Sequence, residues 1–454
     1  MQSPFDIAAD LHTPVSAFLR LAELEPRYLL ESVEGGSQGR YSFIGFGSAR
    51  RFSIDEDGVH DGDGLLSEDP LDGLRTALEL VPQCGPSIAG QPFAGGLVGV
   101  TSFDLVRRLY PVGRAPHPGT VGIGTYMATE SILVFDHLTR RMALLHCGTE
   151  DDRQDLRRDV IDILRGPIGT FNGSGTQSAP VPSMTRDEYM SGVAKVKEHI
   201  TAGDVYQMVL ANRFSGQTDI EPFAAYRALR LTNPSPYMYY LDFGALQVVG
   251  SSPEALVKLR GDTAELRPIA GTRPRGADDD QDQRLERQLL ADSKEAAEHV
   301  MLVDLARNDL GRTAEAGTVH VDPYRTIERY SHVMHLVSGV TGSLRRGLDA
   351  FDLFAATFPA GTVSGAPKLR AIQLIDELEP VNRDLYSGSI GYFGHGGSMD
   401  QAITIRTIVF QEDRYSYQAG AGIVADSDPA HEHEEVLSKA AALQAAFDLA
   451  KEGL

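Results

Sequence analysis

The chain has 454 residues and a formal net charge of −21 at pH 7, with 42% hydrophobic and 23% charged residues. Such a composition is ordinary for a soluble globular protein of two or three domains. The negative charge argues against nucleic acid as a partner, because a phosphate backbone needs a basic surface, although a few focused arginines can still bind a small anion.

Targeting signals and cysteine sites are not expected. No apolar run approaches the ~20 residues that span a bilayer, and the N-terminus lacks the basic start and apolar stretch of a signal peptide. The chain has only two cysteines, Cys84 and Cys147, too few for a disulfide framework or a cysteine zinc site. We therefore expect a cytoplasmic protein without a membrane partner.

The first third of the chain mixes strands and helices. Its apolar pattern predicts a strand at 141–146 and helices near 71–81 and 151–164. Gly, Ser, Thr and Pro then dominate a segment that is typical of a linker or a long exposed loop. We therefore expect an N-terminal regulatory or structural domain (1–165), a linker (166–184) and a C-terminal catalytic domain (185–454), a division that still allows strands to cross.

The C-terminal region opens with a capping box at Thr185–Glu188, which starts a helix. A long helix is predicted from about residue 280 to 310. The last helix begins at Asp428-Pro429, an N-cap followed by proline at the first helical position. Strand-like runs at 237–250, 387–394, 402–410 and 415–419 complete a mixed α/β pattern.

Acidic residues on these helices are candidate metal ligands. Glu432 and Glu435 are three residues apart and so project from one helical face, while Glu298 lies on the earlier helix. Mg²⁺ takes few protein carboxylates and shares oxygens of a bound ligand. Acids also suit a helix N-terminus without any metal, so the residue pattern alone leaves both interpretations open.

Motifs beyond residue 185 resemble the chorismate-utilising enzymes, and among them the large subunits of anthranilate synthases. They include SSPEALVKL (251–259), RPIAGTRPRG (267–276), FPAGTVSGAPK (358–368), AITIRT (402–407) and QAGAGIVADS (418–427). The motifs follow one another in order toward the C-terminus. The resemblance implies the α/β (α+β) fold of that family, in which two domains share large antiparallel-rich sheets with helices outside.

The same resemblance implies a set of site residues. Glu254 matches the general acid that protonates the leaving ring hydroxyl, His335 matches a histidine that assists loss of pyruvate, and Thr362 matches a catalytic position that contacts the substrate. Glu298 and Glu435 match ligands of a Mg²⁺ cofactor, with Glu432 close by, acting through water. The implied substrate-binding residues are Thr272, Gly361, Tyr392, Arg406, Gly420, Ala421 and Gly422. A structural histidine and a tight glycine turn are the alternatives for His335 and for 420–422.

Two absences indicate the reaction. Relatives that add the nitrogen through an enzyme lysine carry it where this chain has Ala270, and relatives that activate water carry a lysine where it has Gln207. The remaining chemistry is attack of ammonia on chorismate, followed by loss of pyruvate to give anthranilate. Neither cysteine lies in the Gly-x-Cys-x-Gly turn of a class I amidotransferase, so the ammonia is expected from a separate glutamine amidotransferase subunit or from solution.

Alternatives to this function stay open at the sequence level. A 2-amino-2-deoxyisochorismate synthase shares the ammonia step and stops before pyruvate loss. A catalytically inactive tryptophan-sensing subunit would not need the acid, metal and arginine groups. The large subunit is expected to form a homo- or hetero-oligomer.

A second site is implied in the N-terminal region. Glu31 and Ser32 resemble one wall of a pocket for the feedback inhibitor tryptophan, and Pro236, Tyr237 and Met238 resemble the other wall. Ordinary packing at a domain boundary is the alternative. Ala402 stands where inhibited relatives often carry cysteine, a departure that puts the affinity for the inhibitor in question.

Overall fold

A computed structural model describes residues 4–32, 39–169, 175–329 and 333–453. Within these ranges, no helix is both long enough and apolar enough to cross a membrane. The longer helices are α1 (Pro14–Arg20), α2 (Pro70–Leu80), α4 (Glu150–Arg165), α5 (Arg186–Ala202), α6 (Pro222–Thr232), α7 (Asp279–Ala291), α8 (Ser293–Gly311), α9 (Ala350–Thr357), α10 (Lys368–Leu378) and α11 (Pro429–Lys451).

Antiparallel pairing joins most strands into one continuous system with two arms, as the sequence predicts for the fold class. The first arm runs through β1 (Ile7–Ala8), β8 (Arg141–His146), β7 (Gly124–Asp136), β3 (Tyr41–Ile54), β2 (Pro26–Glu31), β11 (Tyr237–Asp242), β12 (Leu246–Ser252), β23 (Thr407–Gln411), β24 (Arg414–Ile423), β10 (Gln207–Gln217) and β9 (Val181–Pro182). The second arm leaves β7 through β6 (Gly96–Thr101), β21 (Ser389–Gly394), β22 (Met399–Ile403), β13 (Ala255–Arg260), β14 (Thr263–Leu266), β19 (Val340–Ser343) and β16 (His320–Val321).

Short strands complete the two arms and a separate small sheet. β4 (Val59–Asp61) and β5 (Gly64–Ser67) extend β3, and β20 (Gly365–Ala366) pairs with the start of β10. The small antiparallel sheet contains β15 (Ile269–Pro274), β18 (Val333–Val337) and β17 (Thr326–Arg329).

The two arms separate at a bulge in the long strand β3. Its register with β7 shifts between Phe46 and Ala49, and Gly47 has φ +81°, a backbone conformation that glycine adopts at little cost. A bulge increases local twist and bends its strand. The part of β7 before the shift therefore pairs with β6, and the part after it pairs with β8.

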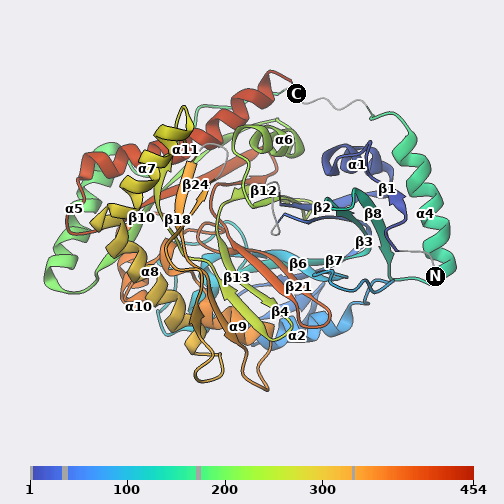
Figure 1. Ribbon diagram of the computed structural model, residues 1–454, viewed down its shortest axis with the longest axis horizontal. Coiled ribbons are helices and arrows are strands. Elements are labelled where there is room, and N and C mark those ends of the chain that lie inside the picture. The colour runs from blue at the N-terminus through green and yellow to red at the C-terminus, as the bar shows by residue number, and fades with distance from the viewer. Residues whose placement is uncertain (1–3, 33–38, 170–174, 330–332, 454) are drawn as a thin grey trace.

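Strands from the two halves of the chain pair with each other, so the sheets run across the expected domain boundary. β2 lies between β3 and β11, and β6 lies between β7 and β21. In Figure 1 the blue and green strands accordingly continue into the orange and red ones, and α11 and α6 lie along one side of the molecule while α2 and α9 lie on the opposite side. The domain boundary at 166–184 remains a prediction.

The expected linker is only partly an exposed loop. Residues 170–174 lie outside the described residues, whereas the segment after them packs on β10. Met184 N donates to Asn212 Oδ1 at 3.0 Å, Ser183 N donates to Arg213 O at 2.7 Å, and β9 pairs with Phe214 and Ser215. These backbone pairings do not depend on apolar side chains, which explains why the composition gave no sign of them.

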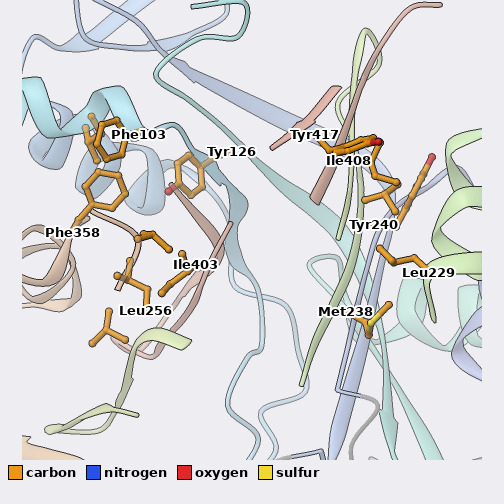
Figure 2. Close-up of a cluster of buried hydrophobic side chains, with 14 of the residues drawn as sticks. Phe103, Tyr126, Leu229, Met238, Tyr240, Leu256, Phe358, Ile403, Ile408 and Tyr417 are labelled. Atoms are coloured by element: carbon orange, nitrogen blue, oxygen red, sulfur yellow. The ribbon is translucent and has the colours of Figure 1, made fainter. Parts of the chain in front are cut away.

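A hydrophobic core extends through both halves of the chain. Figure 2 shows two groups of its side chains. They are Phe103, Tyr126, Leu256, Phe358 and Ile403 in one group, and Leu229, Met238, Tyr240, Ile408 and Tyr417 in the other.

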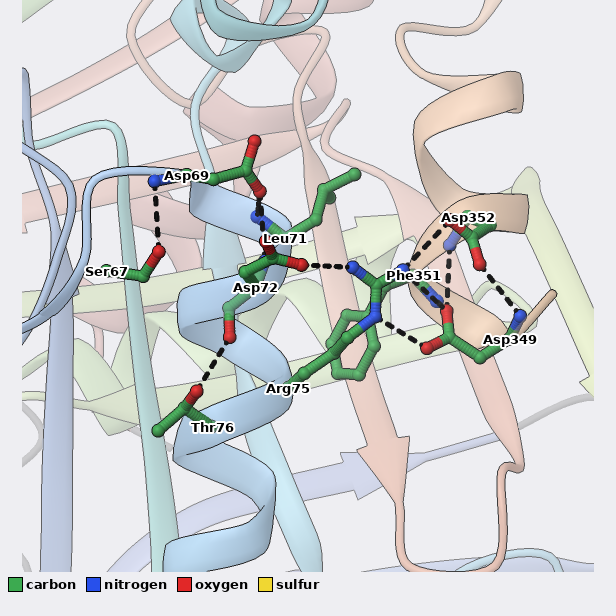
Figure 3. Close-up of polar contacts among 9 residues, drawn as sticks. All are labelled: Ser67, Asp69, Leu71, Asp72, Arg75, Thr76, Asp349, Phe351 and Asp352. Atoms are coloured by element: carbon green, nitrogen blue, oxygen red, sulfur yellow. Dashed lines mark hydrogen bonds and ion pairs between the residues drawn. The ribbon is translucent and has the colours of Figure 1, made fainter. Parts of the chain in front are cut away.

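Ion pairs add a polar tie between the halves. Arg75 of α2 donates to Asp349 Oδ2 at 2.6 Å and to Asp352 Oδ1 at 2.9 Å, both at the start of α9, and also bonds Asp72 of its own helix (Figure 3). The positive charge of Arg75 thus pairs with aspartates that are already favoured at the N-terminus of α9 by the helix dipole.

The long helix expected over 280–310 is two helices. Asp292 has an extended backbone with ψ 114°, and its carboxylate accepts from Lys294 N at 3.0 Å and Glu295 N at 3.2 Å. Asp292 is thus the N-cap of α8 and ends α7. The apolar spacing continued through the break and gave no signal for it. The helices predicted near 71–81, 151–164 and 185 and after Asp428 are confirmed, as is the strand at 141–146.

Candidate active site and a second cavity

Arg406 and His335 line the same cavity, of about 320 Å³, which we call the Arg406 cavity. Arg406 lies between β22 and β23 with φ +49°, unusual for a residue other than glycine. Its Nη1 donates to Asn233 Oδ1 at 3.2 Å, and its carbonyl accepts from Ser251 N at 3.1 Å. A guanidinium at a cavity wall suits a carboxylate ligand because it can donate two parallel hydrogen bonds.

His335 is held in one tautomer by the small sheet. On β18 it pairs with Thr272 of β15. Its Nδ1 lies 3.2 Å from Gly271 O and 3.0 Å from Thr272 Oγ1. Because a carbonyl can only accept, Nδ1 carries the proton and Nε2 carries the lone pair. Burial lowers the pKa of His335, and the nearby Arg406 charge lowers it further, so the ring is a proton acceptor at neutral pH.

Glu254 and Thr362 line a smaller cavity, of about 40 Å³, which we call the Glu254 cavity. Burial raises the pKa of Glu254 to about 7, the range in which a carboxylic acid can donate a proton near neutral pH. The Thr362 hydroxyl is buried and lies close enough to the Glu254 carboxyl to lower the pKa of Glu254, against the larger effect of burial. Gly361 is needed for packing, since a Cβ there would lie 1.8 Å from Leu305 Cδ2 of α8.

The two cavities adjoin through two short segments. Pro253 and Ile269 line the Arg406 cavity, while Glu254 and Pro268, their chain neighbours, line the Glu254 cavity. Glu254 and His335 therefore line cavities that meet at these two segments. Ala270 follows in the same segment and is buried.

Gly420, Ala421 and Gly422 lie in β24, opposite β10, so the tight-turn interpretation is wrong. The glycines make room for two larger side chains. A Cβ at Gly420 would lie 2.7 Å from Tyr386 Oη, and one at Gly422 would lie 2.6 Å from Gln207 Nε2. Gln207 and Tyr386 thus flank the glycine positions. Tyr386 was not among the predicted site residues, although it stands in the loop that immediately precedes β21.

The predicted metal ligands come from α8 and α11. Burial raises the pKa of Glu298, and the negative charges of Glu295 and Glu435 raise it further. Glu435 Oε1 lies 2.7 Å from Lys439 Nζ, which also donates to Gly420 O at 2.8 Å. Glu432 is buried, with 7% of its surface exposed.

These carboxylates fit a hard cation only in part. Among the residues that the structure describes, no three His, Cys, Asp or Glu side chains gather closely enough to hold a metal by themselves. Mg²⁺ commonly uses one or two protein carboxylates together with water and substrate oxygens. Glu298 and Glu435 fit that smaller requirement, and a cation would offset the negative charge of Glu435 that raises the pKa of Glu298.

A third and larger cavity, of about 640 Å³, lies between the N-terminal strands and β21–β22, and we call it the Tyr392 cavity. All five predicted inhibitor residues line it: Glu31, Ser32, Pro236, Tyr237 and Met238. One wall is aromatic, because Tyr392 packs on Phe93 with ring centroids 4.5 Å apart and near Phe43 at 6.3 Å. Ala402 also lines the cavity.

Two predicted roles need correction here. Tyr392 lines this cavity and neither of the cavities that hold Arg406 and Glu254, because alternation along β21 turns it to the opposite face from Phe393. Glu31 is already engaged, since its carboxylate bonds Tyr226 Oη and Arg230 Nε, the latter at 3.0 Å. The Arg230 charge therefore offsets that of Glu31, and only the remaining lone pairs of the carboxylate can receive an amino-acid ammonium group.

The comparisons with known proteins bear on this arrangement. Residues 25–445 match the model of a family described as chorismate binding enzymes. The chain belongs to this family. Anthranilate synthase component 1 of Thermus thermophilus is 45% identical, with 98% of this chain and 97% of that protein covered. The corresponding protein of Pseudomonas putida is 44% identical, with 98% and 94% covered.

Solved structures agree on the fold of this chorismate-binding enzyme. Anthranilate synthase component I from Streptococcus pneumoniae superposes with a TM-score of 0.81 at 34% identity, covering 96% of this chain and 98% of that one. MenF, an isochorismate synthase from Escherichia coli, gives a TM-score of 0.70 at 22% identity, with 95% and 91% covered. The second likeness supports the fold alone.

Proposed function

We propose that this chain is the chorismate-converting subunit of an anthranilate synthase, turning chorismate and ammonia into anthranilate, pyruvate and water. The observation that carries the proposal is the pairing of a near-neutral acid, Glu254, with positions Ala270 and Gln207, neither of which supplies an amine. The enzyme therefore has an acid for the leaving hydroxyl and no lysine of its own to add to the ring. Relatives at 44–45% identity carry the anthranilate synthase name.

The first step is attack of ammonia on the ring at C2 as the C4 hydroxyl departs. Glu254 delivers a proton to that oxygen so that it leaves as water. Arg406 binds the carboxylate of the enolpyruvyl group, and the buried Thr362 hydroxyl, which lies beside Glu254, contributes a hydrogen bond to the substrate. Tyr386 also lines neither the Arg406 cavity nor the Glu254 cavity, and we add it to the substrate-binding residues for its place beside Gly420. Tyr392 we assign to the Tyr392 cavity.

The second step removes the enolpyruvyl group and restores an aromatic ring. A proton leaves ring carbon C2 and the enolpyruvyl group departs as pyruvate. His335 is suited to assist, because its tautomer leaves the lone pair on Nε2 and its pKa is lowered by burial. Thr272 holds the ring through its contact with Nδ1, and is thus a positioning residue.

Glu298 and Glu435 would hold Mg²⁺, with Glu432 buried close by. When bound, the cation would neutralise the ring carboxylate of chorismate. Lys439 ties Glu435 to the carbonyl of Gly420, which places the metal end of the site beside the glycine positions of β24.

Ammonia is proposed to come from a separate glutamine amidotransferase subunit. Cys84 is buried and Cys147 directly follows β8, and neither sequence context is the Gly-x-Cys-x-Gly turn of such an enzyme. The name component 1, printed for the relatives, is consistent with such a partner. The purified chain should therefore use ammonium at alkaline pH and not glutamine. Efficient use of glutamine by the chain alone would contradict the proposal.

Product analysis tests the reaction. The chain is incubated with chorismate, Mg²⁺ and ammonium, and products are identified by fluorescence and mass. We expect anthranilate and pyruvate in equal amounts. Accumulation of 2-amino-2-deoxyisochorismate without pyruvate would favour the alternative synthase, and no consumption of chorismate would favour an inactive sensing subunit.

The Tyr392 cavity is proposed to bind tryptophan as a feedback inhibitor. Its aromatic wall and its volume suit an indole ring. Ser32 is the polar group we assign to the ligand, and Met238 supplies an adaptable apolar contact. Pro236 lines both this cavity and the Arg406 cavity, so a ligand in one can disturb the wall of the other.

A further inference from the structure

The two cysteines of the chain face each other across a pair of extended segments. Gly85 and His146 form an antiparallel bridge and exchange both backbone hydrogen bonds, Gly85 N to His146 O at 2.9 Å and His146 N to Gly85 O at 2.8 Å. Stepping one residue outward on each segment places Cys84 directly opposite Cys147. In an antiparallel ladder, the residues next to a hydrogen-bonded pair form a non-hydrogen-bonded pair. The Cα atoms of such a pair lie about 4.5 Å apart, and both side chains point to the same face.

The surroundings of the two cysteines agree with that register. Cys84 N donates to Ala94 O and Cys147 N donates to Glu130 O, so both amides point away from the pair, as the register requires. The Cys84 thiol lies 3.7 Å from Glu130 O, the acceptor of Cys147 N. Cys84 belongs to a hydrophobic cluster against which Cys147 packs. Burial raises the pKa of Cys84, and the charge of Cys147 raises it further.

A Cα separation near 4.5 Å falls within the range of about 4.4–6.8 Å that disulfides span. We propose that Cys84 and Cys147 are an oxidisable pair that closes to an intramolecular disulfide. The bond would fasten the irregular segment 82–95 to the end of β8. Gln83, Ser87, Ile88 and Gln91 of this segment line the Tyr392 cavity, so the modification site adjoins a ligand cavity. In reducing compartments, such disulfides are usually transient and redox-sensing.

A small disulfide such as oxidised glutathione supplies the oxidising equivalents. The more exposed Cys147 thiolate attacks one of its sulfurs, forming a mixed disulfide and releasing one thiolate. The Cys84 thiolate then attacks Cys147 Sγ and displaces the second. The protein loses two protons and two electrons, and one small disulfide becomes two thiols. Burial raises the pKa of Cys84 to about 12 and also raises that of Cys147, so both steps accelerate as the pH rises.

The test treats the native chain with oxidised glutathione at pH 9, then alkylates remaining thiols after denaturation and maps the peptides by mass. We expect neither thiol to be alkylated and the two peptides to be joined, with the loss of two hydrogens. C84S should instead keep one glutathione on Cys147, and C147S should stay unmodified because Cys84 is buried. A lasting glutathione adduct on wild-type Cys147, a dimer linked through Cys147, or two free thiols would each overturn the proposal.

Hydrogen exchange tests the place of the cross-link. Amides of segment 82–95 should exchange more slowly in the oxidised chain than in the reduced one, while those of α5 should not change. Equal exchange of this segment in the two forms would show that the bond does not fasten the cavity wall and would overturn that part of the proposal.

Discussion

The Tyr392 cavity is the largest of the three cavities and the least reactive, whereas the Glu254 cavity is the smallest and holds the group best suited to chemistry. The first, at about 640 Å³, has aromatic and apolar walls. The second, at about 40 Å³, holds a carboxylic acid with a pKa of about 7. A large apolar pocket is the usual first hypothesis for an active site. Here, residue chemistry distinguishes a binding cavity from a reaction cavity better than volume does.

The largest difference between these regions should appear on removal of metal. Chelation with EDTA should abolish anthranilate formation, and Mg²⁺ should restore it, because Glu298 and Glu435 would supply the carboxylate ligands of the cation. E298Q and E435Q should lose activity by orders of magnitude while tryptophan binding persists. E434Q, an exposed neighbour on α11, is the matched control. Full turnover in excess EDTA would refute the metal assignment.

The second prediction concerns the acid. E254Q should lower kcat by about 100- to 10,000-fold, the usual contribution of general acid–base catalysis, without changing the thermal unfolding midpoint appreciably. E315Q, on an exposed turn, serves as the control. Activity of E254Q within fivefold of the wild type would show that another group protonates the hydroxyl.

The pH dependence gives an independent check on Glu254. Only its protonated form can donate, so at constant free ammonia kcat/KM for chorismate, which reports the free enzyme, should fall as the pH rises through about 7. In E254Q this limb should disappear. A wild-type profile that stays flat between pH 6 and pH 8 would contradict the assignment.

The third prediction separates two tyrosines. Y386F should raise the KM for chorismate by about 10- to 100-fold, since a hydrogen bond to a charged group contributes about 1.5–3 kcal/mol. Y392F should leave that KM within about twofold and alter tryptophan binding instead, because only Tyr392 lines the large cavity. The reverse pattern in steady-state kinetics would restore the sequence-based assignment of Tyr392.

The smallest expected effect is at Ser32. S32A should weaken tryptophan inhibition by about fivefold, the loss of one hydrogen bond of about 1 kcal/mol, with uninhibited turnover nearly unchanged. Linkage also requires chorismate with Mg²⁺ to weaken tryptophan binding by the factor by which tryptophan weakens chorismate binding. Calorimetry that detects no tryptophan binding at millimolar concentration would instead support ordinary packing at this cavity.

Sequence reasoning located most strands and helices that carry the site, and motif order predicted the family and the fold. The runs expected at 237–250 and 402–410 are each two strands, and Arg406 lies in the second of these breaks. The other errors of sequence reasoning concern which way a side chain faces. Tyr392 belongs to a motif of the family, but strand alternation turns it to the other cavity. Glu31 was expected to serve a ligand, yet Arg230, almost two hundred positions along the chain, neutralises it. The break at Asp292 depends on one capping side chain within a continuous apolar pattern. Contacts between residues far apart in the sequence set these features, so a local sequence pattern cannot predict them.

The pairing of β6 with β21 has a consequence for synthesis of the chain. β6 (Gly96–Thr101) leaves the ribosome long before β21 (Ser389–Gly394), its partner in the sheet. At translation rates of about 5–20 residues per second, the edge of β6 that pairs with β21 stays unpaired for on the order of tens of seconds. An apolar strand edge left open is a template for pairing with other chains. We therefore expect aggregation, and the need for chaperones, to be greatest during synthesis, after β6 has left the ribosome and before β21 is made.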